Sequence, residues 1–169
     1  MSKPLQPPAR HHLSAAQGWL ELGNHQAAYE ELSKISPTLS AHPDVLEIRW
    51  QVGAKAQNWE TCLYVASALT LSAPENPQGW TLRASALHQL ERTREARDCL
   101  LHVVSRFPND SPMHYHLACY ECWLGNPQQA LAWLAKAFDL AKGKDPTLRV
   151  LAGPDLKSMW RQMGNSLHS

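Results

Sequence analysis

The stretch Pro77–Asp110 reads PQGWTLRASALHQLERTREARDCLLHVVSRFPND, and its pattern decides the fold class. Ala96, Leu100 and Val103 follow one another at spacings of four and three residues, which places them on one face of a helix. Pro108 stops that helix, because proline lacks an N–H and clashes with the preceding turn. The stretch therefore predicts a hairpin of two helices that ends at a proline.

The same pattern recurs along the chain with a 34-residue period. One column of this repeat is small, and the next two columns are apolar. The small column is Ala28, Cys62, Ala96 and Ala130, and the apolar columns are Leu32, Ala66, Leu100 and Leu134, then Ile35, Leu69, Val103 and Ala137. A single hairpin cannot bury its own apolar face, whereas stacked hairpins bury one another's, so the repeat predicts a short solenoid.

Two local features qualify this pattern. Gly23 and Gly125 lie at equivalent positions in the first and fourth copies, where a left-handed residue suits the turn after a helix. In the second copy, Trp50 and Cys62 stand where small residues and alanine are usual. We therefore expect the helices of the second copy to be packed further apart.

The pattern resembles the tetratricopeptide repeat (TPR), which has the same 34-residue length. The resemblance covers four copies, at residues 9–42, 43–76, 77–110 and 111–144. It implies an all-α fold, a right-handed α-solenoid of helix-turn-helix hairpins with a C-terminal capping helix. We expect residues 1–8 to form a flexible proline-rich tail. Residues 145–169 are expected to form the C-terminal capping helices, since Leu156, Trp160 and Met163 share one helical face.

Composition excludes several classes of protein. The 169 residues are 44% hydrophobic and 18% charged, which is too apolar for a disordered chain. A net charge of +1 is not that of a general nucleic-acid binder. No apolar run approaches the length of a membrane span, and the N-terminal residues show no secretory signal. We expect a cytoplasmic protein with reduced thiols, no nucleic-acid partner and no membrane insertion.

The residues that could carry chemistry form no catalytic set. His114, His116 and Cys119 are close in the sequence, but no oxyanion turn or orienting carboxylate accompanies them. His116, Cys119 and Cys122 can share a helix face and are suitable zinc ligands, although a straight helix converges them poorly. We expect no catalytic residue and no cofactor, and we keep a metal- or thiol-dependent sensor built on these three residues as a third hypothesis.

The resemblance implies a binding groove on the concave surface, which in this family is lined by the first helix of each hairpin. Carried over by alignment, the partner-binding residues are Gln51, Lys55, Leu82, Ser85, His88, Gln89, Tyr115, His116, Cys119 and Trp123. Tyrosine and tryptophan are favoured anchors at interfaces. Tyr115 and Trp123 can equally pack on the capping helix, and both possibilities remain open.

The function implied is a non-catalytic protein–protein interaction module, an adaptor or scaffold that holds a peptide or a helix of a partner protein in this groove. The alternative is a dedicated secretion or assembly chaperone for one client protein. Some bacterial type III secretion chaperones are similar in size and repeat type, and such proteins often dimerise, so a homodimer is also considered.

Overall fold

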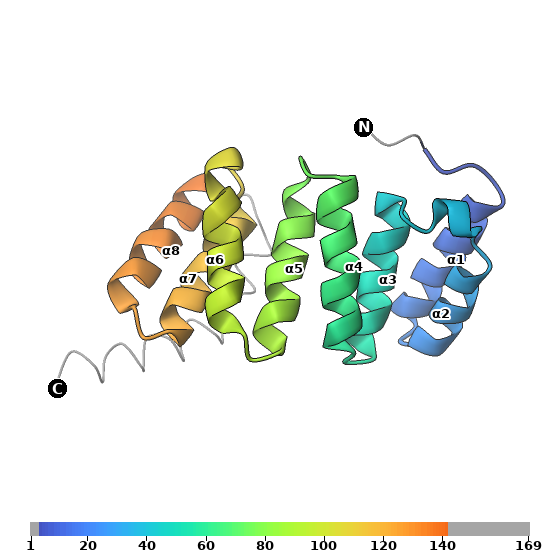
Figure 1. Cartoon of the computed structure of the whole chain (residues 1–169), viewed down its shortest axis with the longest axis horizontal. Coiled ribbons are helices and arrows are strands. Elements are labelled where there is room, and N and C mark those ends of the chain that lie inside the picture. Colours follow the sequence, from blue (N-terminus) through green and yellow to red (C-terminus); the bar gives the residue numbers. More distant parts are fainter. Residues whose placement is uncertain (1–3, 142–169) are drawn as a thin grey trace. The chain divides into compact units, whose positions relative to one another are not determined.

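The computed structural model describes residues 4–141, and within them the chain forms eight α-helices, two short 3-10 helices and no β-strand (Figure 1). The first helices of the hairpins are α1 (Ala9–Glu21), α3 (Pro43–Lys55), α5 (Pro77–Gln89) and α7 (Ser111–Trp123). The second helices are α2 (His25–Ser33), α4 (Trp59–Ser72), α6 (Thr93–Val103) and α8 (Pro127–Ala141). The 3-10 helices are η1 (Pro37–Leu39) and η2 (Val104–Arg106). Within each set, successive α-helices begin with the 34-residue period of the sequence.

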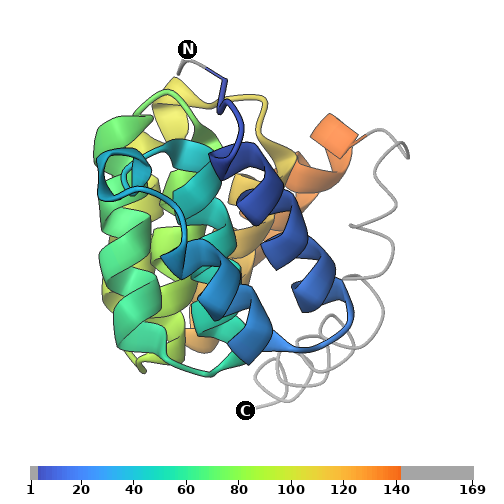
Figure 2. The same cartoon turned by 90° about the vertical axis from the view of Figure 1, so that its right-hand side faces the viewer.

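The chain forms two compact units. The first comprises residues 1–92 and holds α1 to α5, and the second begins at Thr93 and holds α6, α7 and α8. The boundary lies between the two helices of the expected third repeat. Figure 2 shows the first unit with the antiparallel pair α1 and α2 facing the viewer. The expected capping helices at 145–169 lie outside the described residues.

Side-chain caps fix where most of these helices begin. The side-chain oxygens of Asn24, Asn58 and Asp110 each accept a hydrogen bond from the backbone N–H three residues later, at 3.0, 3.1 and 2.7 Å. Asn76 accepts one from the N–H of Gln78 at 3.0 Å. A cap of this kind satisfies one of the backbone donors that the first turn of a helix leaves without a partner. Most of the caps recur with the period of the sequence.

Each hairpin turn contains one residue in the left-handed region, and these residues also recur with the period of the sequence. Gly23 has φ of 78° and Gly125 of 77°, whereas Gln57 and Glu91 have φ of 55° and 62°. A residue with a Cβ adopts this conformation at a cost of about 1 kcal/mol or more, which glycine avoids. The turns at Gln57 and Glu91 are therefore strained relative to those at the two glycines.

This difference predicts opposite effects for two reciprocal substitutions in the first unit. Gln57→Gly should raise the free energy of unfolding by about 0.5–1 kcal/mol, since relief of the left-handed strain exceeds the added entropy of the unfolded chain. Gly23→Gln should lower it by about 1 kcal/mol. No atom lies within 4 Å of a Cβ built on Gly23, so its loss would be conformational rather than steric. Urea denaturation measures both, and effects of the same sign would contradict the assignment.

The repeat columns form the core of each unit. The small column, Ala28, Cys62, Ala96 and Ala130, has no exposed surface at any of its four positions. The two apolar columns are between 0% and 4% exposed throughout. The expectation from the repeat pattern is confirmed: these side chains face inward, and each unit is built by burying them.

The expected wider packing of the second hairpin is wrong. A Cβ built on Gly53 of α3 would lie only 2.9 Å from Sγ of Cys62 on α4, so the two helices approach closely there. Cys62 also donates its S–H to the carbonyl oxygen of Trp50 at 3.5 Å. Trp50 itself is half-buried and packs against Leu46, Val65 and Leu69. Glycine at position 53, not a small residue at position 50, permits the close approach.

Gly53→Ala should therefore destabilise the protein. The new methyl group would overpack a buried contact, at a cost of about 1–3 kcal/mol that exceeds the gain in helix propensity. Gly18→Ala in α1 is the matched control, because no atom lies within 4 Å of a Cβ at that position. It should raise the melting temperature where Gly53→Ala lowers it. Equal gains from both substitutions would show that the contact between Gly53 and Cys62 is not tight.

The N-terminal segment differs from its expectation. Leu5 is 8% exposed and belongs to the first hydrophobic cluster, together with Ala9, Leu20 and Leu32. Leu5 is therefore packed against the first hairpin, while Pro4, Gln6, Pro7 and Pro8 are exposed. The burial of its apolar side chain accounts for this contact, because it removes apolar area from water.

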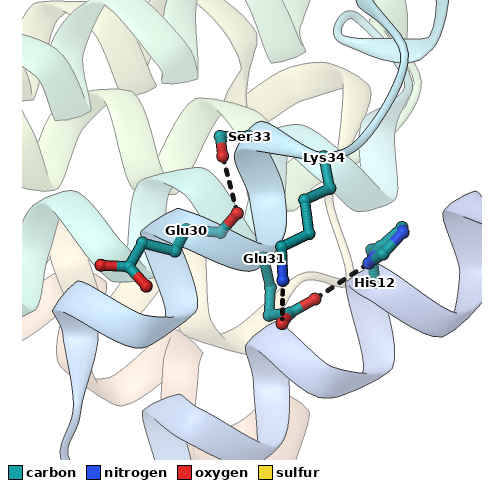
Figure 3. A network of polar contacts seen from close by, with 5 residues as sticks. All are labelled: His12, Glu30, Glu31, Ser33 and Lys34. Atoms are coloured by element: carbon teal, nitrogen blue, oxygen red, sulfur yellow. Dashed lines mark hydrogen bonds and ion pairs between the residues drawn. The ribbon is translucent and has the colours of Figure 1, made fainter.

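A polar network joins the first two helices (Figure 3). Oε2 of Glu31 lies 2.9 Å from Nδ1 of His12 on α1, and Oε1 accepts a hydrogen bond from Nζ of Lys34 at 2.7 Å. The hydrogen bond from Lys34, followed by that from His12, lowers the pKa of the Glu31 carboxyl. Ser33 donates its hydroxyl to the carbonyl oxygen of Glu30 at 2.7 Å. The contact between His12 and Glu31 is the part of this network that links α1 to α2.

Candidate functional site

A cleft of about 450 Å³ lies between the first helices α1 and α3 in the first unit. We call it the α1–α3 cleft, and its lining residues are Gln17, Leu20, Glu21, Trp50, Gln51, Ala54 and Lys55. Two of the sequence-predicted binding residues, Gln51 and Lys55, are among them. Helical spacing explains the set, since residues three and four apart share a face of each helix.

The α1–α3 cleft combines an apolar centre with polar edges. Leu20 is 8% exposed and Trp50 is half-buried, whereas Gln17, Gln51 and Lys55 are exposed. The cleft contains one carboxylate, from Glu21, and one ammonium group, from Lys55. Such a surface offers neutral amide donors and acceptors together with one charge of each sign.

Glu21, Trp50 and Ala54 also line the cleft and were not among the residues expected to bind a partner. Trp50 had a signal, because it is the one large residue in a column that is otherwise small. Its Nε1–H is buried and has no hydrogen-bond partner. A buried donor without an acceptor costs about 1–3 kcal/mol. Trp50 is thus an unusual residue at the floor of the cleft.

The predicted residues of α5 do not line this cleft. Leu82 is half-buried and packs against the cluster of Leu46, Val65 and Leu69. Ser85 and His88 are half-buried, and burial lowers the pKa of the His88 imidazole. Gln89 is exposed. All four of these residues lie on α5. Of the predicted binding residues, only Gln51 and Lys55 line the α1–α3 cleft.

The predicted residues of the second unit all come from α7 and have different environments. Tyr115 is 4% exposed and packs in a cluster with Ala118, Leu134 and Ala137, so it is a core residue and offers no ring to a partner. Its neighbours in that cluster include residues of α8, so of the two possibilities left open for Tyr115 its burial favours internal packing. Trp123 is 71% exposed.

His116 and Cys119 are half-buried on the same helix. The His116 ring lies between the rings of Tyr115 and Tyr120, with centroid distances of 6.3 and 6.0 Å. Cys119 packs against the cluster that contains Tyr115. These contacts place both side chains among neighbouring aromatic and apolar groups of the second unit.

The other polar side chains of α7 are used within the second unit. Glu121 is 5% exposed, accepts a hydrogen bond from Asn126 at 2.7 Å and lies 3.8 Å from Arg97. Ser111 donates to the carbonyl oxygen of Ala137 at 2.8 Å. Both are structural contacts that hold α7 to its neighbours.

His114 was one of the candidate nucleophile partners, and it is fully buried. Its Nδ1 lies 2.7 Å from the carbonyl oxygen of Asp110, which can only accept, so Nδ1 carries the proton. Its ring packs on Trp133 at a centroid distance of 5.6 Å, and its Nε2 has no partner. A buried imidazole held in this way has no access to substrate.

Within residues 4–141, no group of three or more histidine, cysteine or acidic side chains is placed to hold a metal ion. His116, Cys119 and Cys122 therefore do not converge as a ligand set there. Burial raises the pKa of the Cys122 thiol, and it raises that of Cys62 to about 11. A raised thiol pKa disfavours the thiolate that metal binding and nucleophilic attack both require. The thiol-sensor hypothesis gains no support from this geometry.

The part of the chain from residue 4 to residue 141 has no helix long and apolar enough to cross a lipid bilayer.

Comparisons with solved structures establish the fold. A thermophilic TPR protein of Thermus thermophilus, TTC0263, matches 92% of this chain and 83% of its own with a TM-score of 0.73 and 19% identity. MamA from Desulfovibrio magneticus RS-1 matches 81% of this chain and 77% of its own, with a TM-score of 0.70 and 18% identity. A further MamA crystal structure matches 81% and 80%, with a TM-score of 0.71 and 11% identity.

No protein-family model and no curated protein matches the sequence. The structural likeness nevertheless shows that the chain has the TPR fold, an all-α solenoid of helix hairpins, as the period of its sequence predicts.

The cysteine environments predict selective thiol reactivity. Cys62 is fully buried, and burial raises the pKa of its thiol to about 11, so its thiolate is strongly disfavoured at pH 7.5. Iodoacetamide followed by peptide mass mapping should leave Cys62 unmodified in the folded protein and modify it in guanidinium chloride. Cys122 should react more slowly than N-acetylcysteine. Rapid labelling of Cys122 in the folded protein would restore the thiol-sensor hypothesis, and rapid labelling of Cys62 would contradict its burial.

Proposed function

We propose that this protein is a non-catalytic, cytoplasmic adaptor or scaffold that binds a peptide or helix of a partner protein on the surface formed by its first helices. The observation that carries the proposal is the α1–α3 cleft, whose lining comes from consecutive first helices. The TPR fold supports it, because stacked hairpins provide extended, preformed surfaces of this kind. A preformed surface lowers the ordering cost of binding on the protein side.

The chemistry of the cleft suits a peptide segment. The amides of Gln17 and Gln51 can donate to and accept from a peptide backbone, while Leu20 and Trp50 provide apolar contact. Glu21 and Lys55 can each pair with an opposite charge on the ligand. Gln51 and Lys55 are the centre of the proposed site, and Leu82, Ser85, His88 and Gln89 are its proposed extension along α5.

A dedicated chaperone for one client protein is the second candidate. The observation that favours it is the exposure of large apolar side chains in the first unit, where Leu22 and Tyr64 are each 77% exposed and Leu71 is 84% exposed. Where such side chains form one contiguous patch, they provide a surface that can hold an apolar segment of a client. An adaptor should capture several proteins, whereas a dedicated chaperone should capture one.

The experiment is affinity capture from a native lysate, with mass spectrometry of the captured proteins. The test variant is Gln51→Trp with Lys55→Glu, which fills the α1–α3 cleft and reverses its one positive charge. Both side chains are exposed, so the fold should be retained, and circular dichroism checks this. We expect the variant to lose at least about nine tenths of the partner that the wild type captures, as for a hot-spot loss of about 1.4 kcal/mol or more.

Arg10→Glu is the matched control, because it makes the same change in charge at an exposed position of α1 outside the cleft. It should capture the partner as well as the wild type does. Equal capture by the wild type and the cleft variant would contradict the proposed site. Capture of a second copy of this chain alone would favour a homodimer over an adaptor.

A further inference from the structure

A second cleft, of about 540 Å³, lies in the first unit between the second helices α2 and α4, with α3 as its floor. We call it the α2–α4 cleft, and its lining residues are Tyr29, Leu32, Ser33, Arg49, Val52, Gly53, Ala56, Asn58, Thr61, Tyr64 and Val65. None of these residues lines the α1–α3 cleft. The two clefts are therefore separate, and their chemistry differs.

Arg49 is the one charged residue, among those the structure describes, that lines the α2–α4 cleft. Its half-buried guanidinium makes a single hydrogen bond, from Nη1 to the carbonyl oxygen of Ser40, at the long distance of 3.5 Å. Among residues 4–141 no carboxylate lies within ion-pairing distance of it. A guanidinium has five N–H donors and matches the two oxygens of a carboxylate. The α2–α4 cleft thus holds a partly desolvated cation to which the described part of the chain brings no anion.

Aromatic and apolar groups surround this cation. Tyr29 is 62% exposed and Tyr64 is 77% exposed, and both line the cleft. The adjacent apolar side chains of Leu32, Val52 and Val65 are buried. Exposed tyrosines beside a buried apolar floor can enclose an inserted side chain, since their rings bury a large area at a low entropic cost.

We propose that the α2–α4 cleft binds an acidic peptide segment of a partner protein, in which an aspartate or glutamate lies next to an aromatic or large aliphatic residue. The carboxylate pairs with Arg49, and the apolar side chain lies against Leu32, Val52 and Val65 between the two tyrosines. A single cation in an otherwise uncharged lining selects one negative group. A nucleic-acid backbone would require several cations, and this lining has one.

The proposal is tested on the full chain with two matched probes, the peptides Ac-Phe-Asp-Phe-NH2 and Ac-Phe-Asn-Phe-NH2. Binding is followed by NMR, through the backbone amide of Gly53 and the Nε–H of Arg49. The aspartate peptide should shift both signals saturably. The affinity for the asparagine peptide should be lower by a factor of about ten or more, because this peptide lacks the charge-assisted hydrogen bonds.

Three variants assign the site. Arg49→Gln should reduce affinity for the aspartate peptide to that for the asparagine peptide, and Thr61→Trp should abolish binding of both by filling the cleft from an exposed position. Arg10→Gln removes an exposed cation of α1 that lines neither cleft and should leave the affinity unchanged. Folding of each variant is checked by its amide spectrum.

No saturable shift at Gly53 and Arg49 would overturn the proposal, as would equal affinity for the two peptides. Loss of binding in Arg10→Gln with retention in Arg49→Gln would also overturn it. Because the α2–α4 cleft shares no lining residue with the α1–α3 cleft, the result does not depend on the function proposed above.

Discussion

The close approach of paired helices within a unit is the constraint on which the rest of the structure depends. Ala28, Cys62 and Ala130 belong to the hairpins α1/α2, α3/α4 and α7/α8, and none of the three has any exposed surface. A larger side chain at such a position would force the helices apart or strain the core. Small residues determine the distance between the two helices of a hairpin. Larger apolar side chains then fill the space between adjacent hairpins of a unit. The clefts of the first unit lie where that filling is incomplete.

Much of the fold could be predicted from the 34-residue repeat of the sequence. Which side chains outside the repeat columns are exposed to solvent could not be predicted. The 34-residue period determines which face of each helix is buried against the neighbours that it meets along the chain. The period does not show where an unusual residue in one column is compensated by a second residue of the same hairpin. Trp50 predicted a wider hairpin, yet Gly53 one turn later permits close contact with Cys62. The prolines before Ala9 similarly predicted a loose tail, although Leu5 among them is buried.

The candidate site was less predictable, because a groove residue is defined by two helices and a repeat column describes only one. Tyr115 and Trp123 lie on the same helix and looked equally suited to anchor a partner. The structure buries the first to 4% exposure and leaves the second at 71%. Gln51 and Lys55 line a cleft because Gln17 and Leu20 lie opposite them on α1, and that pairing is a tertiary fact. Nothing in the sequence distinguished Arg49 from the residues at the equivalent position of the other repeats.

Both units contain buried polar groups, and these groups differ in how completely their hydrogen bonds are satisfied. In the second unit, Nε2 of His114 on α7 is buried without a partner, whereas Glu121 and Ser111 of the same helix meet Asn126 and Ala137. Those contacts satisfy the groups and leave them little to offer a ligand. In the first unit, Arg49 has one long hydrogen bond and no carboxylate among the described residues, and Trp50 has a buried N–H without an acceptor. An incompletely satisfied polar group can meet a ligand where it lines a cleft, and of these groups Arg49 lines the α2–α4 cleft and Trp50 the α1–α3 cleft, both from α3.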